Sequence, residues 1–143
     1  MGFPDRIERT LELAHPPAKV WAAITTAEGL GTWFGNKATV DLSPGGAVEM
    51  SWNDGPTKTL RVERVEEPAV FGFTWQPDGV LDDDPRRTYV EFTLEAVGAG
   101  TRLTVVETGF AQLADEAYAI GFPSHTEGWP RELAELVEYL DAA

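Results

Sequence analysis

The feature of this sequence that most constrains its fold is a succession of alternating apolar and polar segments between residues 38 and 108. Alternation with a period of two places every second side chain on the same face of a strand. Turn-forming sequences separate most of the segments, for example 43–46 (SPGG) and 98–100 (GAG). Such short joints connect neighbouring antiparallel strands. The region therefore predicts an antiparallel meander of six strands, at 38–42, 47–52, 57–66, 70–76, 87–97 and 101–108.

One further strand and two short helices are predicted before the meander. Residues 7–14 alternate between apolar and polar side chains, and the prolines at 16 and 17 end that strand. Apolar residues then recur at helical spacing over 20–24 and again over 30–34. Thr25 and Glu28 have the spacing of a capping box, so Thr25 is expected to open the second helix, and Gly35 to end it.

A long amphipathic helix is predicted near the C-terminal end. Its apolar stripe consists of Trp129, Leu133, Leu136, Val137 and Leu140. Ser124 and Glu127 again have capping-box spacing, so the helix is expected over 124–140. Pro130 lies too deep for a first turn, which predicts either a kink there or a helix that begins at about that residue. Residues 111–120 are compatible with a loose helix or a loop.

The order of these elements predicts an α+β fold. It consists of a curved antiparallel sheet of about six to seven strands packed on a long C-terminal helix, with two short helices after the first strand. The 143 residues have the length of one domain, which is expected to span 1–143.

Composition excludes several classes of partner. The chain has 11 Lys and Arg against 24 Asp and Glu, a formal charge of −13, which repels nucleic acid and anionic lipid. No apolar run approaches the roughly 20 residues that cross a bilayer, so a cytoplasmic protein with neither nucleic acid nor membrane as partner is expected. With two histidines, no cysteine and none of the usual nucleotide-binding or hydrolase motifs, neither a metal nor a cofactor is expected. The sequence leaves open whether the protein is a monomer or a homodimer.

Several short motifs carry a resemblance to a known superfamily. Residues 16–21 (PPAKVW) are similar to the opening of the first helix in the START-like (SRPBCC) superfamily, whose fold is called a helix-grip. One branch of it is formed by bacterial relatives of the C-terminal domain of the activator of heat-shock protein 90 ATPase. The segments that resemble this branch are 30–35 (LGTWFG), 44–46 (PGG), 73–75 (FTW), 100–104 (GTRLT) and 128–129 (GW). The resemblance covers about 7–140 and implies a cavity between the sheet and the long helix.

Strand parity selects the side chains that face this helix. Three sets share a parity: 48, 50 and 52; 71, 73 and 75; and 90, 92 and 94. They are expected either to pack as a plain core or, as the resemblance implies, to line an apolar cavity. The apolar residues expected at such a cavity are Trp33, Phe34, Met50, Trp52, Phe73, Trp75, Phe92 and Trp129.

Two polar residues are added to this candidate site. Glu107 shares a parity with Leu103 and Val105, so its carboxylate either points inward as an anchor or base, or is solvated at the rim of the sheet. His125 lies four residues before Trp129, on the same helical face, and is either in the cavity or exposed at the helix end. Trp129 itself is expected either to close the cavity or to belong to a packed core.

Three functions are compatible with these features. The leading hypothesis is a binding module that holds a small, largely apolar molecule between the sheet and the C-terminal helix. The second is a protein that interacts with a chaperone, because an acidic surface docks on a basic one. The third is an enzyme resembling polyketide cyclases, with Glu107 and His125 as acid and base. The sequence identifies neither a ligand nor a catalytic group.

Overall fold

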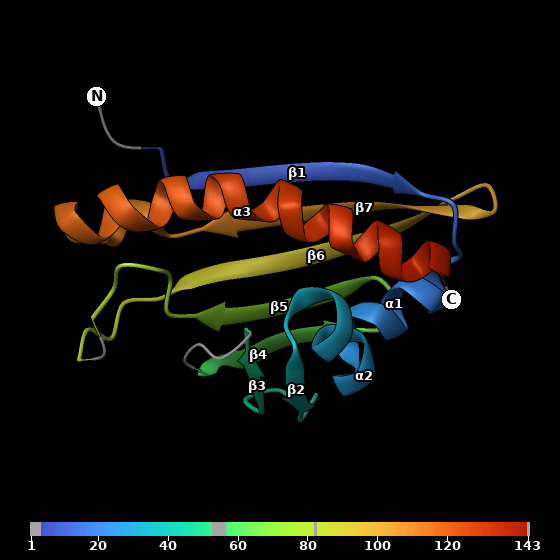
Figure 1. Cartoon of the computed structure of the whole chain (residues 1–143), viewed down its shortest axis with the longest axis horizontal. Coiled ribbons are helices and arrows are strands. Elements are labelled where there is room, and N and C mark those ends of the chain that lie inside the picture. The colour runs from blue at the N-terminus through green and yellow to red at the C-terminus, as the bar shows by residue number, and fades with distance from the viewer. Residues whose placement is uncertain (1–3, 53–56, 82, 143) are drawn as a thin grey trace.

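A computed structural model describes residues 4–52, 57–81 and 83–142. Its seven strands form one antiparallel sheet in the order β1-β7-β6-β5-β4-β3-β2 (Figure 1). This confirms the predicted meander and the additional first strand. The strands are β1 (Arg6–Leu13), β2 (Lys37–Val40), β3 (Ala47–Ser51), β4 (Thr57–Glu66), β5 (Val70–Trp75), β6 (Thr88–Val97) and β7 (Gly100–Thr108).

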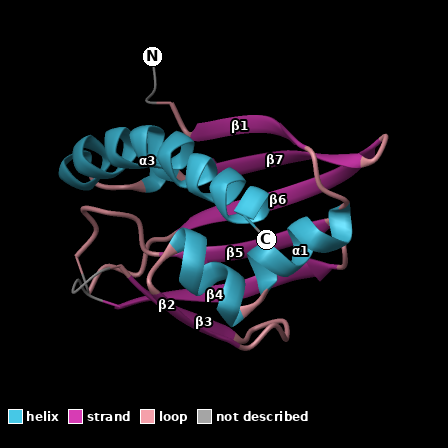
Figure 2. Cartoon of the chain, turned by 45° about the vertical axis from the view of Figure 1, so that its right-hand side comes forward, coloured by secondary structure: helices cyan, strands magenta, loops and turns pink. Residues whose placement is uncertain are grey.

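The helices lie on one face of the sheet, as Figures 1 and 2 show. The long helix α3 runs along β1, β7 and β6, and α2 and the π-helical turn η1 pack beside β2. This is the predicted α+β helix-grip architecture. No helix in the described part of the chain is long and apolar enough to cross a bilayer. The helices are α1 (Pro17–Thr25), α2 (Ala27–Gly29), η1 (Leu30–Phe34), the short 3-10 turn η2 (Phe110–Gln112) and α3 (Asp115–Ala142).

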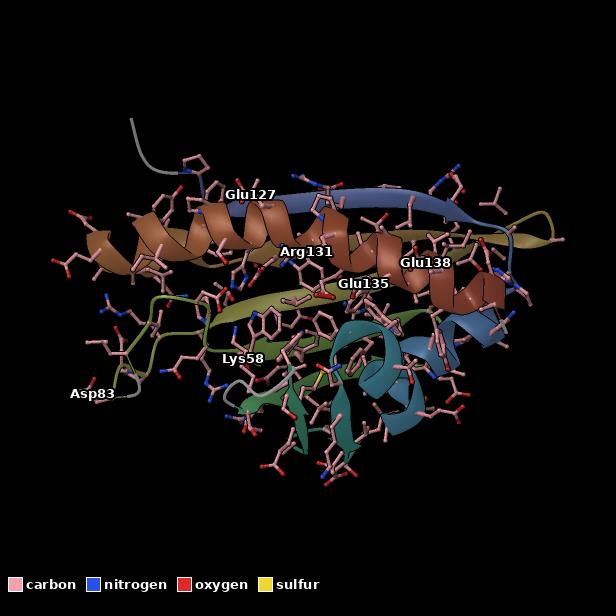
Figure 3. All side chains as sticks on the ribbon, viewed as in Figure 1. Lys58, Asp83, Glu127, Arg131, Glu135 and Glu138 are labelled. Atoms are coloured by element: carbon pink, nitrogen blue, oxygen red, sulfur yellow. The ribbon has the colours of Figure 1, made fainter. Side chains whose placement is uncertain are left out.

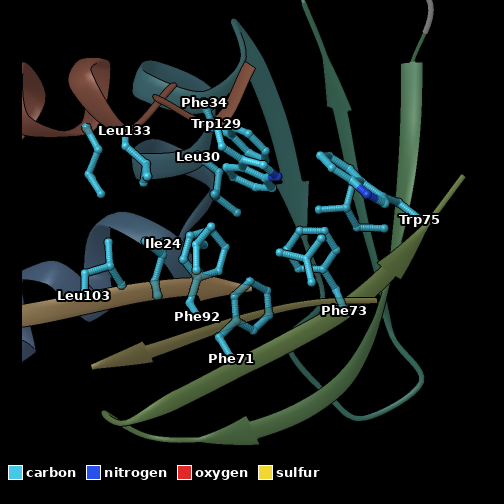
Figure 4. Packing of buried hydrophobic residues seen from close by; sticks show 14 of the residues in the cluster. Ile24, Leu30, Phe34, Phe71, Phe73, Trp75, Phe92, Leu103, Trp129 and Leu133 are labelled. Atoms are coloured by element: carbon cyan, nitrogen blue, oxygen red, sulfur yellow. The ribbon is translucent and has the colours of Figure 1, made fainter. Parts of the chain in front are cut away.

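The core lies between the sheet and the helices (Figure 4). The predicted inward sets of β3, β5 and β6 are buried, apart from Trp52, which is half-buried just beyond the end of β3. Phe71 and Phe92 stack with their ring centroids 6.3 Å apart, and Phe73 packs against both. A bulge between Val62 and Arg64 shifts the register of β4 against β5, which bends the sheet around this core.

The cap of the second helix differs from the prediction by one residue. Thr26, not Thr25, caps α2, because its hydroxyl accepts a hydrogen bond from the amide of Gly29 at 3.0 Å. The hydroxyl of Thr25 instead donates to the carbonyl of Trp21 inside α1. Gly35 ends the helical segment as predicted.

The C-terminal helix begins at Asp115, rather than at Ser124 or Pro130 as the sequence predicted. Asp115 and Glu116 in the first turn favour this start through the helix dipole. The helix continues through Pro130, although proline has no amide to donate to the carbonyl of Thr126. Arg9 on β1 offers that carbonyl a guanidinium nitrogen at 3.5 Å, so a neighbouring strand supplies a replacement donor.

Candidate functional site

A buried carboxylate organises one end of the core. Glu107 on β7 has no exposed surface, and four donors surround it. The indole nitrogen of Trp75 and the hydroxyl of Thr88 donate to Oε2 at 2.8 and 2.6 Å. The indole nitrogen of Trp129 lies 2.8 Å from Oε1, and Nδ1 of His125 lies 2.7 Å from the same oxygen. Each oxygen therefore has two partners, and the carboxylate is fully satisfied without water.

This geometry decides between the two interpretations of Glu107. It points inward in register with Val90 of β6 and Ile7 of β1, so the solvated-rim interpretation was wrong. Burial alone raises the pKa of the Glu107 carboxyl, but hydrogen bonds from His125, Thr88 and Trp75 outweigh it and hold the pKa below its ordinary value. The carboxylate is consequently ionised at neutral pH.

His125 is also buried, which excludes the exposed-terminus interpretation. The backbone amide of Asp78 donates to Nε2 of His125 at 3.2 Å. A ring nitrogen that accepts a hydrogen bond carries no proton. The proton is therefore on Nδ1, which donates a hydrogen bond to Oε1 of Glu107. The imidazole is thereby fixed between a strand carboxylate and a loop amide.

Two glycines allow the loop that carries Asp78 to approach α3. A Cβ on Gly121 would lie 2.5 Å from the carbonyl oxygen of Asp78. Gly79 has a φ of +90°, and a Cβ there would lie 2.8 Å from the Cβ of Ile120. With the loop in place, Ser124 donates to the Asp78 carboxylate at 2.7 Å, and Lys58 lies 3.2 Å from its other oxygen. Burial raises the pKa of Asp78. The charge of Lys58 and the hydrogen bond from Ser124 lower it by more, so the pKa lies below its ordinary value.

A pocket of about 330 Å³ lies above this network. Its aromatic wall is formed by Phe34, Trp52, Trp75 and Trp129. The rings of Phe34 and Trp129 stack with centroids 5.7 Å apart, and Trp52 meets Phe34 edge-on at 5.4 Å. The polar part of the wall consists of Lys58, Asp78, Ser124, His125, Arg131 and Glu132, with Gly128 between them.

The predicted site residues fall into four groups. Five of them line this pocket: Phe34, Trp52, Trp75, His125 and Trp129. Glu107 lies behind the wall and holds two of its tryptophans and its histidine in place. Phe73 and Phe92 lie in the packed core (Figure 4), and Met50 is also buried there. Trp33 lines a neighbouring groove of about 770 Å³.

Sequence reasoning missed the charged part of the wall. Lys58 shares the parity of the buried Leu60 and Val62, so strand alternation carried a usable signal. Glu132 follows His125 and Trp129 at helical spacing, so the sequence also indicated that it lies on the same face of the helix. Asp78 lies in the loop between β5 and β6, where no periodicity exists to place it.

Glu132 differs from the other charged residues of the wall. Its Oε2 atom is buried and has no hydrogen-bond partner among the described residues. Burial raises the pKa of Glu132, and the neighbouring Glu135 carboxylate raises it further, to about 8. Glu132 therefore carries a proton at neutral pH. No group of three or more metal-ligating side chains occurs in the part of the chain that the structure describes.

A comparison with protein-family models shows which family the chain belongs to. The family model described as activator of Hsp90 ATPase homolog 1-like protein matches residues 14–141. The chain belongs to this family. The resemblance that the short motifs indicated is thus confirmed. A search of curated proteins found no match to this activator-homologue domain.

Solved structures share the fold of this activator-homologue domain. Protein MLL2253 of Mesorhizobium loti is 25% identical with a TM-score of 0.81, over 96% of this chain and 98% of that one. PFC0360w, an HSP90 activator from Plasmodium falciparum, is 21% identical with a TM-score of 0.80, over 96% and 97%. DynU16, from the dynemicin biosynthetic locus, is 23% identical with a TM-score of 0.79, over 97% of this chain and 48% of that one.

Proposed function

We propose that the domain binds a small, largely apolar molecule in the aromatic pocket. The observation that carries the proposal is the pocket of about 330 Å³ with four aromatic side chains in its wall. Small-molecule sites have volumes of about 300 to 1,000 Å³ and combine apolar walls with a few fixed polar groups, so this one is suited to a compact ligand. The space lies at one end of the interface between the sheet and α3, because the centre of that interface is packed.

The Glu107 network supports the same proposal. It fixes the positions of Trp75, Trp129 and His125, three residues of the wall, before any ligand arrives. Binding to a preorganised wall avoids the entropic cost of ordering those side chains. The four donors that hold the wall also compensate for burial of the carboxylate.

A ligand screen with one wall variant tests the proposal. Thermal shift against aromatic metabolites, sterols and fatty acids should identify compounds that stabilise the protein. Trp52→Ala removes a half-buried ring from the wall and should weaken binding of a hit about tenfold or more, because stacked ring contacts are lost. Tyr89→Ala is the matched control, since Tyr89 is also half-buried but lies on the opposite face of the sheet. No response to any compound, or equal losses in both variants, would contradict the proposal.

Interaction with a chaperone is the second candidate, and family membership favours it. The formal charge of −13 suits docking on a basic partner surface. The two functions are separable, because stimulation of the ATPase of an Hsp90 homologue should survive Trp52→Ala if the pocket plays no part in it. The third hypothesis, acid–base catalysis by Glu107 and His125, has less support, since all the lone pairs and protons that these groups offer are already engaged.

A further inference from the structure

The charges around the pocket suggest the chemical class of its ligand. Arg131 lines the pocket from α3, with its side chain exposed. Its guanidinium forms no hydrogen bond or ion pair with residues 4–52, 57–81 and 83–142, although its charge acts on the Glu132 carboxyl. It lies beside Gly128, where no side chain blocks it. In Figure 3, Arg131 lies on the edge of α3 nearer to Lys58, whereas Glu127 lies on the opposite edge. An unpaired guanidinium at a pocket is a ready partner for a carboxylate.

Lys58 makes the pocket unfavourable for a cation. Its ammonium lies 4.4 Å from the centre of the Trp75 ring and 3.2 Å from the Asp78 carboxylate. Lys58 therefore occupies the place over the Trp75 ring that an organic cation would take. The negative charge of Asp78 is likewise engaged, by both Lys58 and Ser124. A cationic ligand would meet two positive side chains and no free carboxylate on this part of the wall.

Glu132 shares a proton with Glu135 and adds no second negative charge to the wall. Burial, the charge of Glu135 and a hydrogen bond to that carboxylate raise the pKa of Glu132 to about 8. The proton is therefore engaged with Glu135, whereas the buried Oε2 atom has no partner among the described residues. At neutral pH the Glu132 carboxyl consequently does not repel an anion in the pocket.

We propose that the ligand is an organic anion, namely a planar ring system that carries a carboxylate. The rings lie against Trp52, Trp75 and Trp129, and the carboxylate pairs with Arg131. This inference rests on the proposed function of the pocket. It adds the charge of the ligand and the residue that recognises it.

Three probes with the same bicyclic ring test the inference by calorimetry at pH 7: 2-naphthoate, 2-naphthamide and 2-naphthylmethylammonium. The anion should bind tightest. Arg131→Gln should weaken binding of 2-naphthoate about tenfold and leave the amide nearly unchanged, because only the anion makes a charge-assisted hydrogen bond. Arg61→Gln is the matched control: it removes the same charge from β4, where Arg61 is exposed and pairs with Glu63. It should leave binding of all three probes unchanged.

A variant of Glu132 completes the test. Glu132→Gln replaces the carboxyl by an uncharged amide of the same size and should change binding of 2-naphthoate by less than about threefold, because the wild-type carboxyl is also uncharged at pH 7. If the variant instead tightens binding of the anion about tenfold, a charged Glu132 repels it and the inference is wrong. Equal affinity for anion and amide, or tightest binding of the ammonium, would overturn the anion while the pocket function stands. Binding of none of the probes, together with no response in the wider ligand screen, would contradict the pocket function itself.

Discussion

Replacement of Glu107 by glutamine is expected to lower the free energy of unfolding by about 3 to 5 kcal/mol. The amide of glutamine would point its own donor at two of the four groups that now donate to the carboxylate. Whichever way the amide is oriented, the indole N–H of Trp75 or of Trp129 would lose its acceptor and face another donor. Urea unfolding of both proteins at pH 7 measures the difference.

Glu95→Gln is the matched control for this change. Glu95 lies on the neighbouring strand β6, but it is exposed and pairs with Arg102 at 3.0 Å. Loss of an exposed ion pair costs less than about 1 kcal/mol. A loss below about 1 kcal/mol for Glu107→Gln as well would contradict the buried, fully bonded carboxylate that the structure shows.

The effect of Glu107→Gln should also depend on pH in a defined direction. The pKa of Glu107 is lowered in the folded protein, so its stabilisation is present in full above the unfolded-state pKa of about 4.3. It is lost as the pH falls below that value and through the lower folded-state pKa. The difference in stability between wild type and variant should therefore be constant from pH 6 to 8 and shrink as the pH falls below about 4.

Truncation of Trp129 is expected to produce the second large loss. Only 3% of its surface is exposed, and its ring packs on Phe34, Trp75 and Phe92. Trp129→Ala should cost about 3 to 5 kcal/mol, as for a buried aromatic side chain. The loss should fall toward the lower value, because one side of the ring borders the pocket and lacks packing partners there.

Trp129→Phe separates the packing of the ring from its hydrogen bond. Phenylalanine keeps most of the ring contacts but leaves Oε1 of Glu107 with His125 alone, which should cost about 1 to 3 kcal/mol. In the Glu107→Gln background the same change should cost less, since the hydrogen bond is already impaired. A loss below about 1 kcal/mol for Trp129→Ala would contradict the packing of the ring on Phe34, Trp75 and Phe92.

Strand parity predicted most of the sheet, since alternation depends only on the sequence along one strand. It placed Phe71, Phe73 and Phe92 inward, and it allowed an inward Glu107. It could not identify the donors to Glu107, because they come from β5, β6 and two turns of α3 that only the tertiary fold brings together. Burial of a carboxylate is unfavourable until those donors are known.

The start of α3 shows a different limit of the sequence. Gly121, Pro123, Gly128 and Pro130 lie within it and have low helix propensity, so local rules placed the start too late. Tertiary contacts outweigh those propensities. Gly121 admits the backbone of Asp78, and Arg9 donates to the carbonyl that Pro130 leaves free.

Spectroscopy of the five tryptophan indoles tests the central proposal most directly. Trp52, Trp75 and Trp129 line the pocket, whereas Trp21 packs on Phe71 in the core and the indole of Trp33 donates to the carbonyl of Ala23. In ¹H–¹⁵N spectra titrated with 2-naphthoate, we expect shifts of the three pocket indole signals, with those of Trp21 and Trp33 unchanged. Shifts confined to Trp21 and Trp33, or no shift of any indole at saturating ligand, would contradict it.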